Sequence, residues 1–407
     1  MVPAYIDALH EAFEPKKLRS FDAIVVGAGF AGAVAARELA ERAGRSVAVV
    51  EKRAHIAGNA YDHYDGQGVL IHEYGPHIFH SNFERVYSYL SRFTKWRDYE
   101  HEVLAFVRGS YIPVPFNLNS IDLSFSADEA AVINDSLVKT YGNGSKVPII
   151  ELRGQGDPLL RKLADYVYEN IFLHYTVKQW GLRPEEIDPA VTARVPVLVG
   201  RDNRYFQDRF QGMPTEGYTA LFQRLLNHPN IELILNLDAR QVLSFQESEG
   251  GKGSFKAIEV CGAPYEGILI YTGALDELSQ ERLGMLPYRS LEFVYRHHKQ
   301  GRVQPCGTVN FTVSEDFTRS SEYTWLTGQE TNVSTIAEEY PVAYVDPGRQ
   351  IPYYPIISED NLAFYNCYRD LFKDLKNFYT LGRLAEYHYY NMDQIVLRAL
   401  ELIDEIS

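Results

Sequence analysis

The chain has 407 residues, 45% of them apolar and 13% aromatic, and its 54 acidic and 40 basic side chains give a formal net charge of −14. This length and composition predict a globular protein of two or three domains whose cores need no disulfide or metal support. Because a strongly acidic chain repels nucleic acid and anionic lipid at long range, the charge argues against a polyanion-binding protein.

Cysteine usage and hydropathy indicate a cytoplasmic protein. Cys261, Cys306 and Cys367 have no short spacing that would indicate a zinc knuckle or a redox pair, so we expect three reduced thiols. Residues 1–20 lack the apolar core of a signal peptide, and no later window approaches the roughly 18 apolar residues of a membrane span. We therefore expect a cytoplasmic location and no membrane partner.

The first predicted element is a βαβ unit. The apolar run FDAIVV stops at a turn containing Gly27, Gly29 and Gly32, the helical stretch AVAARELAER follows, and a second apolar run ends in Glu51. Such glycines permit a tight turn, a close approach of backbone N–H groups to a pyrophosphate, and close packing of helix on strand. Glu51 can accept hydrogen bonds from a ribose hydroxyl, so the pattern predicts a dinucleotide site. A glycine turn that serves packing alone is the alternative.

The segment after Glu51 favours a flavin over a nicotinamide. Gly58 and Asn59 lie in a loop that would return beside the pyrophosphate, a continuation common among flavin proteins of this fold, so FAD is expected. The next segment, HEYGPHIFHSN, contains three histidines: His72, His77 and His80. Because no cysteine or HExxH helix accompanies them, we expect no metal site.

The middle of the chain predicts a hairpin and then a helix. Residues 104–117 read as a hairpin with Arg108 and Gly109 near its turn, and their prolines suggest an edge or bent strand. The helix begins at Asp157 and Pro158, a good N-cap followed by proline at the first position. Its apolar stripe predicts core positions: Leu159, Leu160, Leu163, Val167, Ile171 and Phe172. The residues that follow where the stripe fades are functional candidates, with packing as the alternative: Tyr175, Lys178 and Trp180.

The rest of the chain predicts a return to the first domain. Residues 211–221 are rich in glycine and proline and precede a helix, and residues 231–237 resemble a strand that rejoins the nucleotide domain. Residues 288–340 alternate polar and apolar side chains in short runs, as an antiparallel sheet does. A last apolar run, a turn at Gly382-Arg383 and a long amphipathic helix from about Met392 then follow, so one domain both opens and closes the chain.

Seven segments occur in order between about residues 22 and 400: VVGAGFAGAV, HIAGNAYD, YGPHIFH, YTVKQWG, RYFQDRFQGMPTEGY, IPYYPI and GRLAEYHYYNMD. Together they resemble the UDP-galactopyranose mutase family, flavoenzymes that interconvert UDP-galactopyranose and UDP-galactofuranose. Residues 1–20 lie outside the resemblance. Seven ordered motifs over nearly the whole chain are far more specific than one glycine motif.

The resemblance implies an α/β fold in which a Rossmann-like FAD-binding domain is discontinuous in sequence and is joined by a helical-bundle insertion and an antiparallel β-sheet domain. The implied bounds are 1–85, 213–280 and 360–407 for the FAD-binding domain, 119–193 for the helical domain, and 86–118, 194–212 and 281–359 for the antiparallel-sheet domain. We also expect a homo-oligomer such as a dimer.

The resemblance implies that FAD is bound and that its reduced form is active. The cofactor-binding positions that it implies are Gly27, Gly29, Phe30, Gly32, Glu51, Asn59, His77, Arg383, Met392 and Asp393. The N-terminus of the helix that starts at Met392 would stabilise negative charge on the reduced ring. His77 matches a flavin-facing histidine and is also given a catalytic role, a plain core histidine being the alternative.

For the substrate, the resemblance implies that Arg194 and Arg319 grip the diphosphate of UDP-galactose and are catalytic. An arginine fork presents paired donors to phosphate oxygens. For Arg194, an ordinary exposed arginine is the alternative. The further substrate-binding positions implied are Tyr175, Trp180, Tyr205, Asn310, Tyr354, Tyr389 and Asn391.

Two residues depart from the family pattern. Ile171 stands where some relatives carry an aromatic beside the uracil, so stacking from that side is expected to be weaker. Asn391, in YYNMD, stands where some relatives carry an aspartate. An asparagine keeps a hydrogen bond but no charge, so we expect it to be neither acid nor base.

The resemblance implies a non-redox use of the flavin. Reduced FAD attacks the anomeric carbon through N5, UDP leaves, and a flavin–sugar adduct opens to an iminium before the ring recloses through a different hydroxyl. Accordingly, the sequence shows no convincing Ser-His-Asp set, glycosidase carboxylate pair or Cys-His nucleophile. The expected role is the supply of UDP-galactofuranose for cell-wall polysaccharide. An FAD-dependent oxidase or dehydrogenase is one alternative, and a flavin- or nucleotide-sugar-binding protein without turnover is another.

Overall fold

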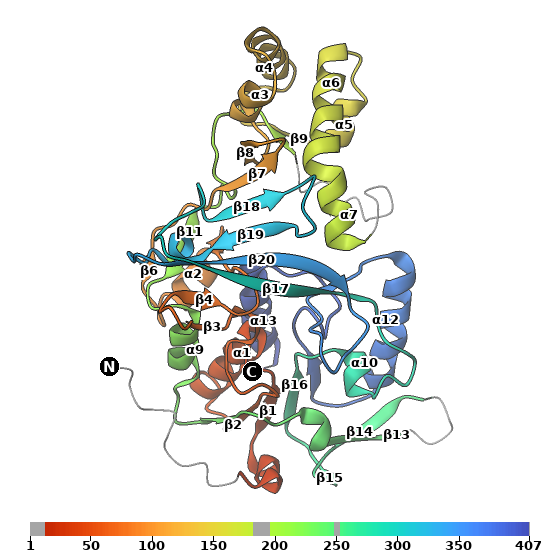
Figure 1. Ribbon diagram of the computed structural model, residues 1–407. Helices are drawn as coiled ribbons and strands as arrows, with labels where there is room; N and C mark the ends of the chain where they lie inside the picture. Colours follow the sequence, from red (N-terminus) through yellow and green to blue (C-terminus); the bar gives the residue numbers. More distant parts are fainter. Residues whose placement is uncertain (1–12, 182–195, 248–252, 407) are drawn as a thin grey trace. The chain divides into compact units, whose positions relative to one another are not determined.

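The computed structural model describes residues 13–181, 196–247 and 253–406 (Figure 1). Within these ranges the chain forms two compact units. Unit 1 takes the described residues up to Tyr61, then Thr219–Leu286 and the described residues from Asp360 onward, whereas unit 2 takes Asp62–Tyr218 and Pro287–Glu359. The division into three domains with the bounds given above stays a prediction.

Unit 1 is built on a five-stranded sheet with the order β12-β2-β1-β16-β22, and all of its pairings are parallel. Its strands are β1 (Ala23–Val26), β2 (Val47–Val50), β12 (Ile231–Ile234), β16 (Ile268–Tyr271) and β22 (Phe378–Thr380). The runs AIVV and VAVV of β1 and β2 are buried almost throughout, as expected where both faces of a parallel sheet are covered. The sheet confirms the predicted Rossmann-like α/β fold.

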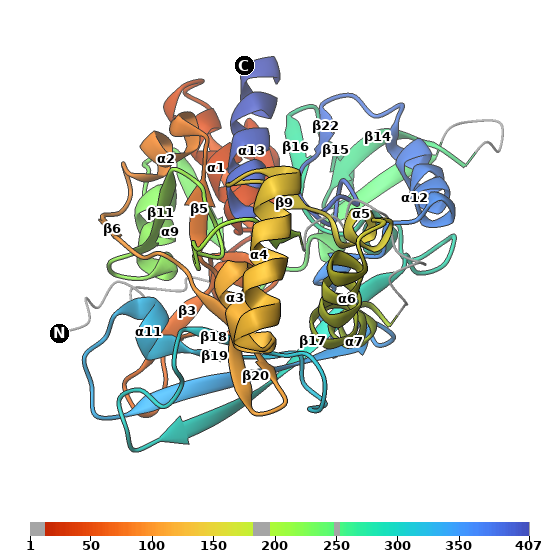
Figure 2. The ribbon, with the colours of Figure 1, turned by 90° about the horizontal axis from the view of Figure 1, so that it is seen from above.

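The helices of unit 1 come from widely separated parts of the sequence. They are α1 (Phe30–Glu41), α9 (Tyr218–Leu226), α10 (Leu275–Leu278), α12 (Glu359–Phe372) and α13 (Met392–Ile406). The first and last of them, α1 and α13, pack against each other (Figures 1 and 2). The helix predicted from about Met392 is confirmed. A small antiparallel sheet and three 3-10 turns complete the unit: β13 (Leu243–Glu247), β14 (Phe255–Val260), β15 (Ala263–Pro264), η1 (Pro15–Ser20), η2 (Gly58–Ala60) and η5 (Ala239–Gln241).

Unit 2 contains a seven-stranded sheet with the order β21-β17-β20-β19-β18-β7-β8, antiparallel except between β18 and β7. Its strands are β7 (Val103–Val107), β8 (Ser110–Val114), β17 (Tyr288–His298), β18 (Thr308–Phe311), β19 (Arg319–Glu322), β20 (Ser334–Ala343) and β21 (Tyr354–Pro355). The predicted hairpin is present, with positive φ at Arg108 (51°) and Gly109 (88°), and its proline-containing strand β8 lies at the sheet edge. The antiparallel sheet predicted over residues 288–340 is confirmed as well.

Short strands and helices make up the remainder of unit 2. The strands are β3 (Asp62–Tyr64), β4 (Leu70–His72), β5 (Phe79–Ser81), β6 (Trp96–Arg97), β9 (Lys146–Val147), β10 (Val197–Leu198) and β11 (Phe210–Pro214). The helices are α2 (Glu84–Leu90), α3 (Leu118–Ser124), α4 (Ala127–Tyr141), α5 (Ile149–Arg153), α6 (Pro158–Val167), α7 (His174–Trp180) and α11 (Tyr323–Thr327). A π-helical turn, η3 (Tyr168–Leu173), joins α6 to α7. None of the helices that the structure describes is long and apolar enough to cross a bilayer.

Helices α3 to α6 and the turn η3 share a core with the hairpin β7–β8. Asp157 caps α6 by accepting the N–H of Leu159 at 2.8 Å, and Pro158 is the first helical residue, as predicted. Most of the predicted stripe is buried, with Leu159 only partly buried: Leu160, Leu163, Val167, Ile171 and Phe172. The core therefore holds α6 and η3, from which α7 continues.

Candidate functional site

The glycine turn of unit 1 is close-packed backbone. Gly27 has a φ of 103°, and a Cβ built on it would lie 2.0 Å from Thr272 Oγ1. A Cβ on Gly32 would lie 2.0 Å from the carbonyl oxygen of Gly27, and one on Gly58 would lie 2.9 Å from the Cα of Gly29. Each position therefore requires glycine on steric grounds. The two loops on which the dinucleotide prediction rests, at residues 27–32 and 58–60, lie against each other.

The start of α1 presents backbone donors as expected. Gly29 is the N-cap, and the hydrogen-bond ladder of the helix begins with the N–H of Ala33 donating to the Gly29 carbonyl at 2.8 Å. The N–H groups before Ala33 are therefore outside the ladder, where a phosphate can accept them. The side chain of Phe30 is buried and lies 4.6 Å from Phe222, ring centre to ring centre, so only its backbone is suited to a cofactor.

Glu51 and Asn59 lie in polar contacts beside this turn. The buried carboxylate of Glu51 accepts the N–H groups of Ala28 and Arg53, both at 2.9 Å. Carboxylate oxygens carry further lone pairs, so acceptance of a ribose hydroxyl stays a prediction. Asn59 accepts a hydrogen bond from Arg53 Nη2 at 2.9 Å. Arg53 and Thr272 were not predicted from the sequence, because neither stands in the glycine motif.

The C-terminal cofactor candidates also belong to unit 1. Arg383 follows Gly382, which has a φ of 113°, and its Nη2 donates to the carbonyl of Tyr390 at 2.7 Å. Its guanidinium carbon lies 4.9 Å from the centre of the Tyr389 ring. Helix α13 begins at Met392, with the N–H of Asn391 donating to Gln394 Oε1 at 2.8 Å. Asp393, in the first turn, is buried.

These groups suit a dinucleotide. Glycine backbone without room for a Cβ, helix N-terminal donors and a buried carboxylate at the end of a strand are what a nucleotide diphosphate and its ribose require. The cofactor-binding roles given to these residues stay predictions.

In unit 2, four residues form a cluster around Arg319, here called the arginine cluster: Tyr175, Asn310, Arg319 and Glu339. Arg319 Nη2 donates to the hydroxyl of Tyr175 at the start of α7. Asn310 on β18 and Glu339 on β20 are the direct cross-strand partners of Arg319 on β19. Arg319 Nε lies 3.8 Å from Glu339 Oε1, with 30% of the arginine side chain and 5% of the glutamate side chain exposed.

The arginine cluster contains buried polar atoms without partners among the described residues. Arg319 Nε is a buried donor and Asn310 Oδ1 a buried acceptor, and neither has a hydrogen-bond partner there. Buried polar groups are normally paired, so Arg319 Nε can donate to a ligand and Asn310 Oδ1 can accept a hydrogen bond from one. A phosphate oxygen would be such an acceptor, and a nucleobase N–H such a donor.

Burial sets the protonation of the cluster. It raises the pKa of the Tyr175 hydroxyl to about 12, with Arg319 opposing that rise. Tyr175 is therefore neutral near pH 7, and because its oxygen accepts from Arg319, its O–H can donate to another group. Burial also raises the pKa of Glu339, while Arg319 lowers it. Paired with the arginine, the carboxylate offsets part of the cost of burying that charge.

The other substrate candidates of unit 2 lie on α7, on the edge strand β21 of the same sheet, and in a loop. Trp180, at the end of α7, and Tyr354, on β21, have ring centres 6.0 Å apart. Tyr205 is 37% exposed, and its N–H donates to the His101 carbonyl at 2.7 Å.

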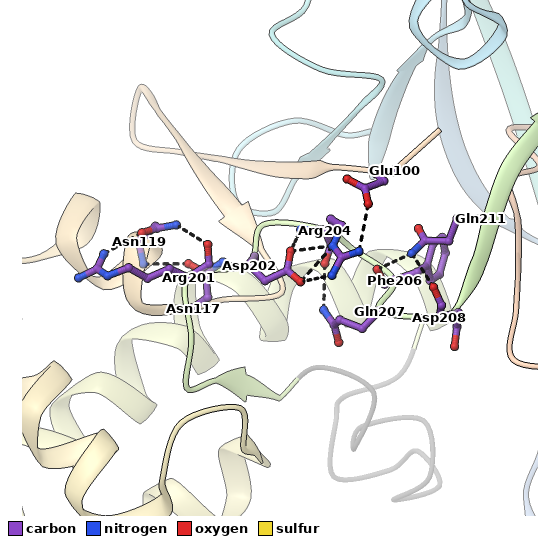
Figure 3. A network of polar contacts seen from close by, with 10 residues as sticks. All are labelled: Glu100, Asn117, Asn119, Arg201, Asp202, Arg204, Phe206, Gln207, Asp208 and Gln211. Atoms are coloured by element: carbon purple, nitrogen blue, oxygen red, sulfur yellow. Dashed lines mark hydrogen bonds and ion pairs between the residues drawn. The ribbon is translucent and has the colours of Figure 1, made fainter. Parts of the chain in front are cut away.

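A polar network fixes the loop that carries Tyr205 (Figure 3). Arg204 donates to both oxygens of Asp202, at 2.7 to 3.0 Å, and to Glu100 at 3.0 Å. Gln211 Nε2 donates to the carbonyls of Phe206 and Asp208, both at 3.0 Å. These bonds hold the loop on both sides of Tyr205.

His77 is positioned by a second histidine. The backbone N–H of His77 donates to the ring Nδ1 of His72 at 3.0 Å, and the ring Nδ1 of His77 lies 2.9 Å from the carbonyl oxygen of Gly75. Burial lowers the pKa of His72 to about 3, so His72 is neutral and its Nδ1 is the acceptor. The carbonyl of His72 accepts hydrogen bonds from Tyr295 and Tyr323. His72 thus holds the turn of His77, a role that the sequence does not reveal. In the described part of the chain, His, Cys, Asp and Glu side chains form no group of three that could ligate a metal.

Arg194 and Ile171 were also singled out in the sequence. Arg194 lies outside the described residues, so its role at a diphosphate stays a prediction. Ile171, at the departure from the family pattern, is 4% exposed and belongs to the helical core. The residues around the arginine cluster that the sequence argument missed are Glu339 and His101; they stand in strands or loops with no recognisable motif.

A family model, a curated relative and a solved structure that match this chain all carry the description UDP-galactopyranose mutase. The family model described as UDP-galactopyranose mutase matches residues 170–389, and that of an NAD(P)-binding Rossmann-like domain matches residues 25–93. The chain is 34% identical over 389 residues to a probable UDP-galactopyranose mutase of Klebsiella pneumoniae, covering 94% of each chain. It is 32% identical over 383 residues to a dTDP-fucopyranose mutase of Escherichia coli, covering 93% of this chain and 96% of the relative. A crystal structure of reduced UDP-galactopyranose mutase superposes with a TM-score of 0.66 at 17% identity, covering 94% of this chain and 93% of that one.

Proposed function

Since the chain belongs to the UDP-galactopyranose mutase family of isomerases, we propose that it interconverts UDP-galactopyranose and UDP-galactofuranose, with reduced FAD as its cofactor and no net redox change. In this proposal most of the FAD-binding residues belong to unit 1, and His77 to unit 2. Most of the UDP-sugar-binding residues belong to unit 2, and Tyr389 and Asn391 to unit 1. The covalent flavin route that the resemblance implies is part of the proposal, and so is UDP-galactofuranose supply as its cellular role.

The observation that carries the proposal is the arginine cluster. Arg319 combines a fixed guanidinium with a buried Nε donor that lacks an acceptor among the described residues, and Asn310, its cross-strand partner, has a buried acceptor without a donor. A diphosphate beside the arginine and a uracil edge beside the asparagine would satisfy both atoms. The aromatic side chains of Trp180 and Tyr354 offer apolar surface for the sugar and the base.

The chemistry proposed for the protein is mainly binding and orientation. Arg319 holds the diphosphate and stabilises the charge that develops on it as UDP departs, and Tyr175 donates its hydroxyl proton to a phosphate oxygen. When bound, reduced FAD supplies the nucleophile for the anomeric carbon. The residues of unit 1 hold the cofactor through backbone donors, with Arg383 and the start of α13 beside negative charge on it.

The test is an anaerobic assay of purified, FAD-loaded protein reduced with dithionite. UDP-galactopyranose and UDP-galactofuranose, each supplied separately, should be converted to the same equilibrium mixture, while oxidised protein should convert them poorly. Absence of conversion by the reduced protein would refute the proposal. Consumption of oxygen in step with oxidation of the sugar would instead identify an oxidase.

A second nucleotide sugar belongs in the same assay, because a relative that matches almost as well is a dTDP-fucopyranose mutase. We expect kcat/KM to be higher with UDP-galactose than with dTDP-fucose. The reverse order would leave the reaction class intact and change the substrate. Comparing UDP with dTDP as inhibitors would then separate the contribution of the base from that of the sugar.

A further inference from the structure

Helix α7 and the hairpin β18–β19 carry most of the substrate candidates of unit 2 between them. Tyr175 and Trp180 lie on α7, whereas Asn310 and Arg319 lie on the two strands of the hairpin. The geometry of the proposed UDP site therefore depends on how α7 is joined to this hairpin. Among the described residues, the hydrogen bond from Arg319 to Tyr175 joins the candidates on the helix to those on the hairpin.

A lysine makes the connection. The ammonium group of Lys178, on α7, donates to three backbone carbonyls of the hairpin turn: Phe311 at 2.5 Å, Glu315 at 2.8 Å and Phe317 at 3.1 Å. A lysine ammonium has three N–H donors and no acceptor, so the turn uses its full bonding capacity. Lys178 thus has no donor left for a substrate phosphate, although it stands in the segment YTVKQWG between two substrate candidates.

The position of Lys178 on the helix connects it to the arginine cluster. Lys178 follows Tyr175 by three residues, so both side chains leave the same face of α7. The Tyr175 hydroxyl accepts a hydrogen bond from Arg319, the first residue of β19. Lys178 donates hydrogen bonds to the turn that precedes β19. Trp180, two residues further on, points from another face and contacts Tyr354.

Other bonds hold α7 at its two ends. Just before α7, in η3, the carbonyl of Asn170 accepts a hydrogen bond from the hydroxyl of Thr312, the first residue of the hairpin turn, at 2.5 Å. At the end, the buried guanidinium of Arg289 donates to the carbonyls of Gln179 and Lys178, at 3.0 and 3.2 Å. Lys178 adds three bonds from α7 to both sides of the turn, at Phe311, Glu315 and Phe317. Without Lys178, Glu315 and Phe317 lose these bonds to the helix.

We propose that Lys178 is a positioning residue, which sets the spacing between α7 and the β18–β19 hairpin and thereby the affinity of the site for UDP, without contacting the substrate. The inference rests on the proposed function, because UDP is taken as the ligand of this site. A cation that lies in a cradle of three carbonyls fixes a loop in the way that a bound metal ion would. A neutral side chain of similar length cannot do so.

The test is Lys178→Met in the full-length, FAD-loaded protein, with UDP as the probe in isothermal titration calorimetry. We expect the Kd for UDP to rise about 10- to 100-fold, the range that loss of a charged hydrogen-bond network produces. KM for the nucleotide sugar should rise in parallel, while the FAD absorbance spectrum and flavin content stay as in the wild type. A role in stability alone would lower Tm and leave the Kd of the folded protein unchanged, which would overturn the inference.

Two further variants complete the experiment. Lys139→Met removes the same group from an exposed ion pair with Asp135 on α4 and should leave the Kd unchanged; an equal loss there would attribute the effect to net charge and overturn the inference. Lys178→Arg keeps the charge but spreads its donors over three nitrogens, so its Kd should lie between those of wild type and Lys178→Met. If Lys178→Met does not fold, the Kd of Lys178→Arg for UDP tests the inference instead. A Kd equal to that of the wild type would overturn the inference.

The result also separates this inference from the function on which it rests. A wild-type protein that binds no UDP would refute the proposed function and this inference together. Wild-type binding with equally tight binding by Lys178→Met would refute only the inference.

Discussion

The two units present their candidate sites in different ways. In unit 1 the site is mostly backbone, where Gly27, Gly32 and Gly58 lie so close to other atoms that no Cβ fits. In unit 2 the site consists of side chains, and Arg319 is held by a tyrosine from a helix and a glutamate from a neighbouring strand. The difference teaches that backbone recognition is encoded locally, whereas side-chain recognition depends on contacts between distant segments.

The largest effect is expected from Gly32→Ala in unit 1. The new Cβ would lie 2.0 Å from the carbonyl oxygen of Gly27, which a rigid turn cannot accommodate. We expect bound flavin, measured by absorbance after gel filtration, to fall by about tenfold or more. Gly66→Ala, at a glycine with open space and no positive φ, is the control and should keep its flavin. Full flavin binding by Gly32→Ala would show that this turn is not the cofactor site.

Arg319→Ala should lower kcat/KM without changing flavin binding, and so should distinguish the role of unit 2 from that of unit 1. The variant loses charge-assisted bonds to the diphosphate and leaves Glu339 buried without its arginine, so kcat/KM should fall about 100-fold or more. Flavin content should not change, because every predicted cofactor group except His77 lies in unit 1. Arg296→Ala removes an exposed arginine paired with Glu338 in the same sheet and should be near wild type. Loss of flavin from Arg319→Ala would contradict the division of roles between the units.

A smaller effect concerns a buried carboxylate in unit 1. Asp276 is 2% exposed, its Oδ2 accepts the N–H of Leu286 at 2.8 Å, and its Oδ1 is buried without a partner among the described residues. Burial raises the pKa of Asp276 to about 6, while the backbone bonds lower it. Because this lies above the unfolded value of 3.8, the folded protein binds the proton more tightly, and its stability falls as the pH rises from about 4 to about 6.

Asp276→Asn should therefore be stabilising at neutral pH. We expect a gain of about 2 kcal/mol in the free energy of unfolding above pH 6, shrinking as the pH falls towards 4, where the wild-type side chain is also neutral. Urea unfolding at several pH values measures it. A gain that is the same at every pH would show that ionisation is not its cause. The variant also tests whether unit 1 depends on side chains as unit 2 does.

The site of unit 1 was easier to predict from the sequence than that of unit 2, because it is formed by residues that are close together in the chain. The strand, turn and helix around Gly27 were predictable because the apolar runs and the glycines stand next to each other in sequence. The long helix from Met392 has a clear period and begins where it was expected. The hairpin at Arg108-Gly109 was also predictable, since its turn residues lie between two alternating runs.

The surroundings of Arg319 were not predictable from the residues alone. Asn310 and Glu339 become its neighbours only through the strand registers of a seven-stranded sheet. The bonds of Lys178 are harder still to predict, because their acceptors are backbone carbonyls, which every residue carries. Resemblance to a family supplied candidate residues here, but it did not indicate which side chains hold them in place.

The assembly of unit 1 from three separate segments has a consequence for its synthesis. Strand β1 leaves the ribosome early, but its neighbour β16 lies about 245 residues later in the chain, and β22 and α13 later still. At roughly 10 residues per second, on the order of 30 s pass between the appearance of Glu51 and that of Arg383. The early βαβ segment must stay soluble as an incomplete sheet during that time. The predicted cofactor site is therefore incomplete until β22 and Arg383 have been synthesised, and a nascent chain stalled before residue 378 would carry unit 2 but no finished nucleotide fold.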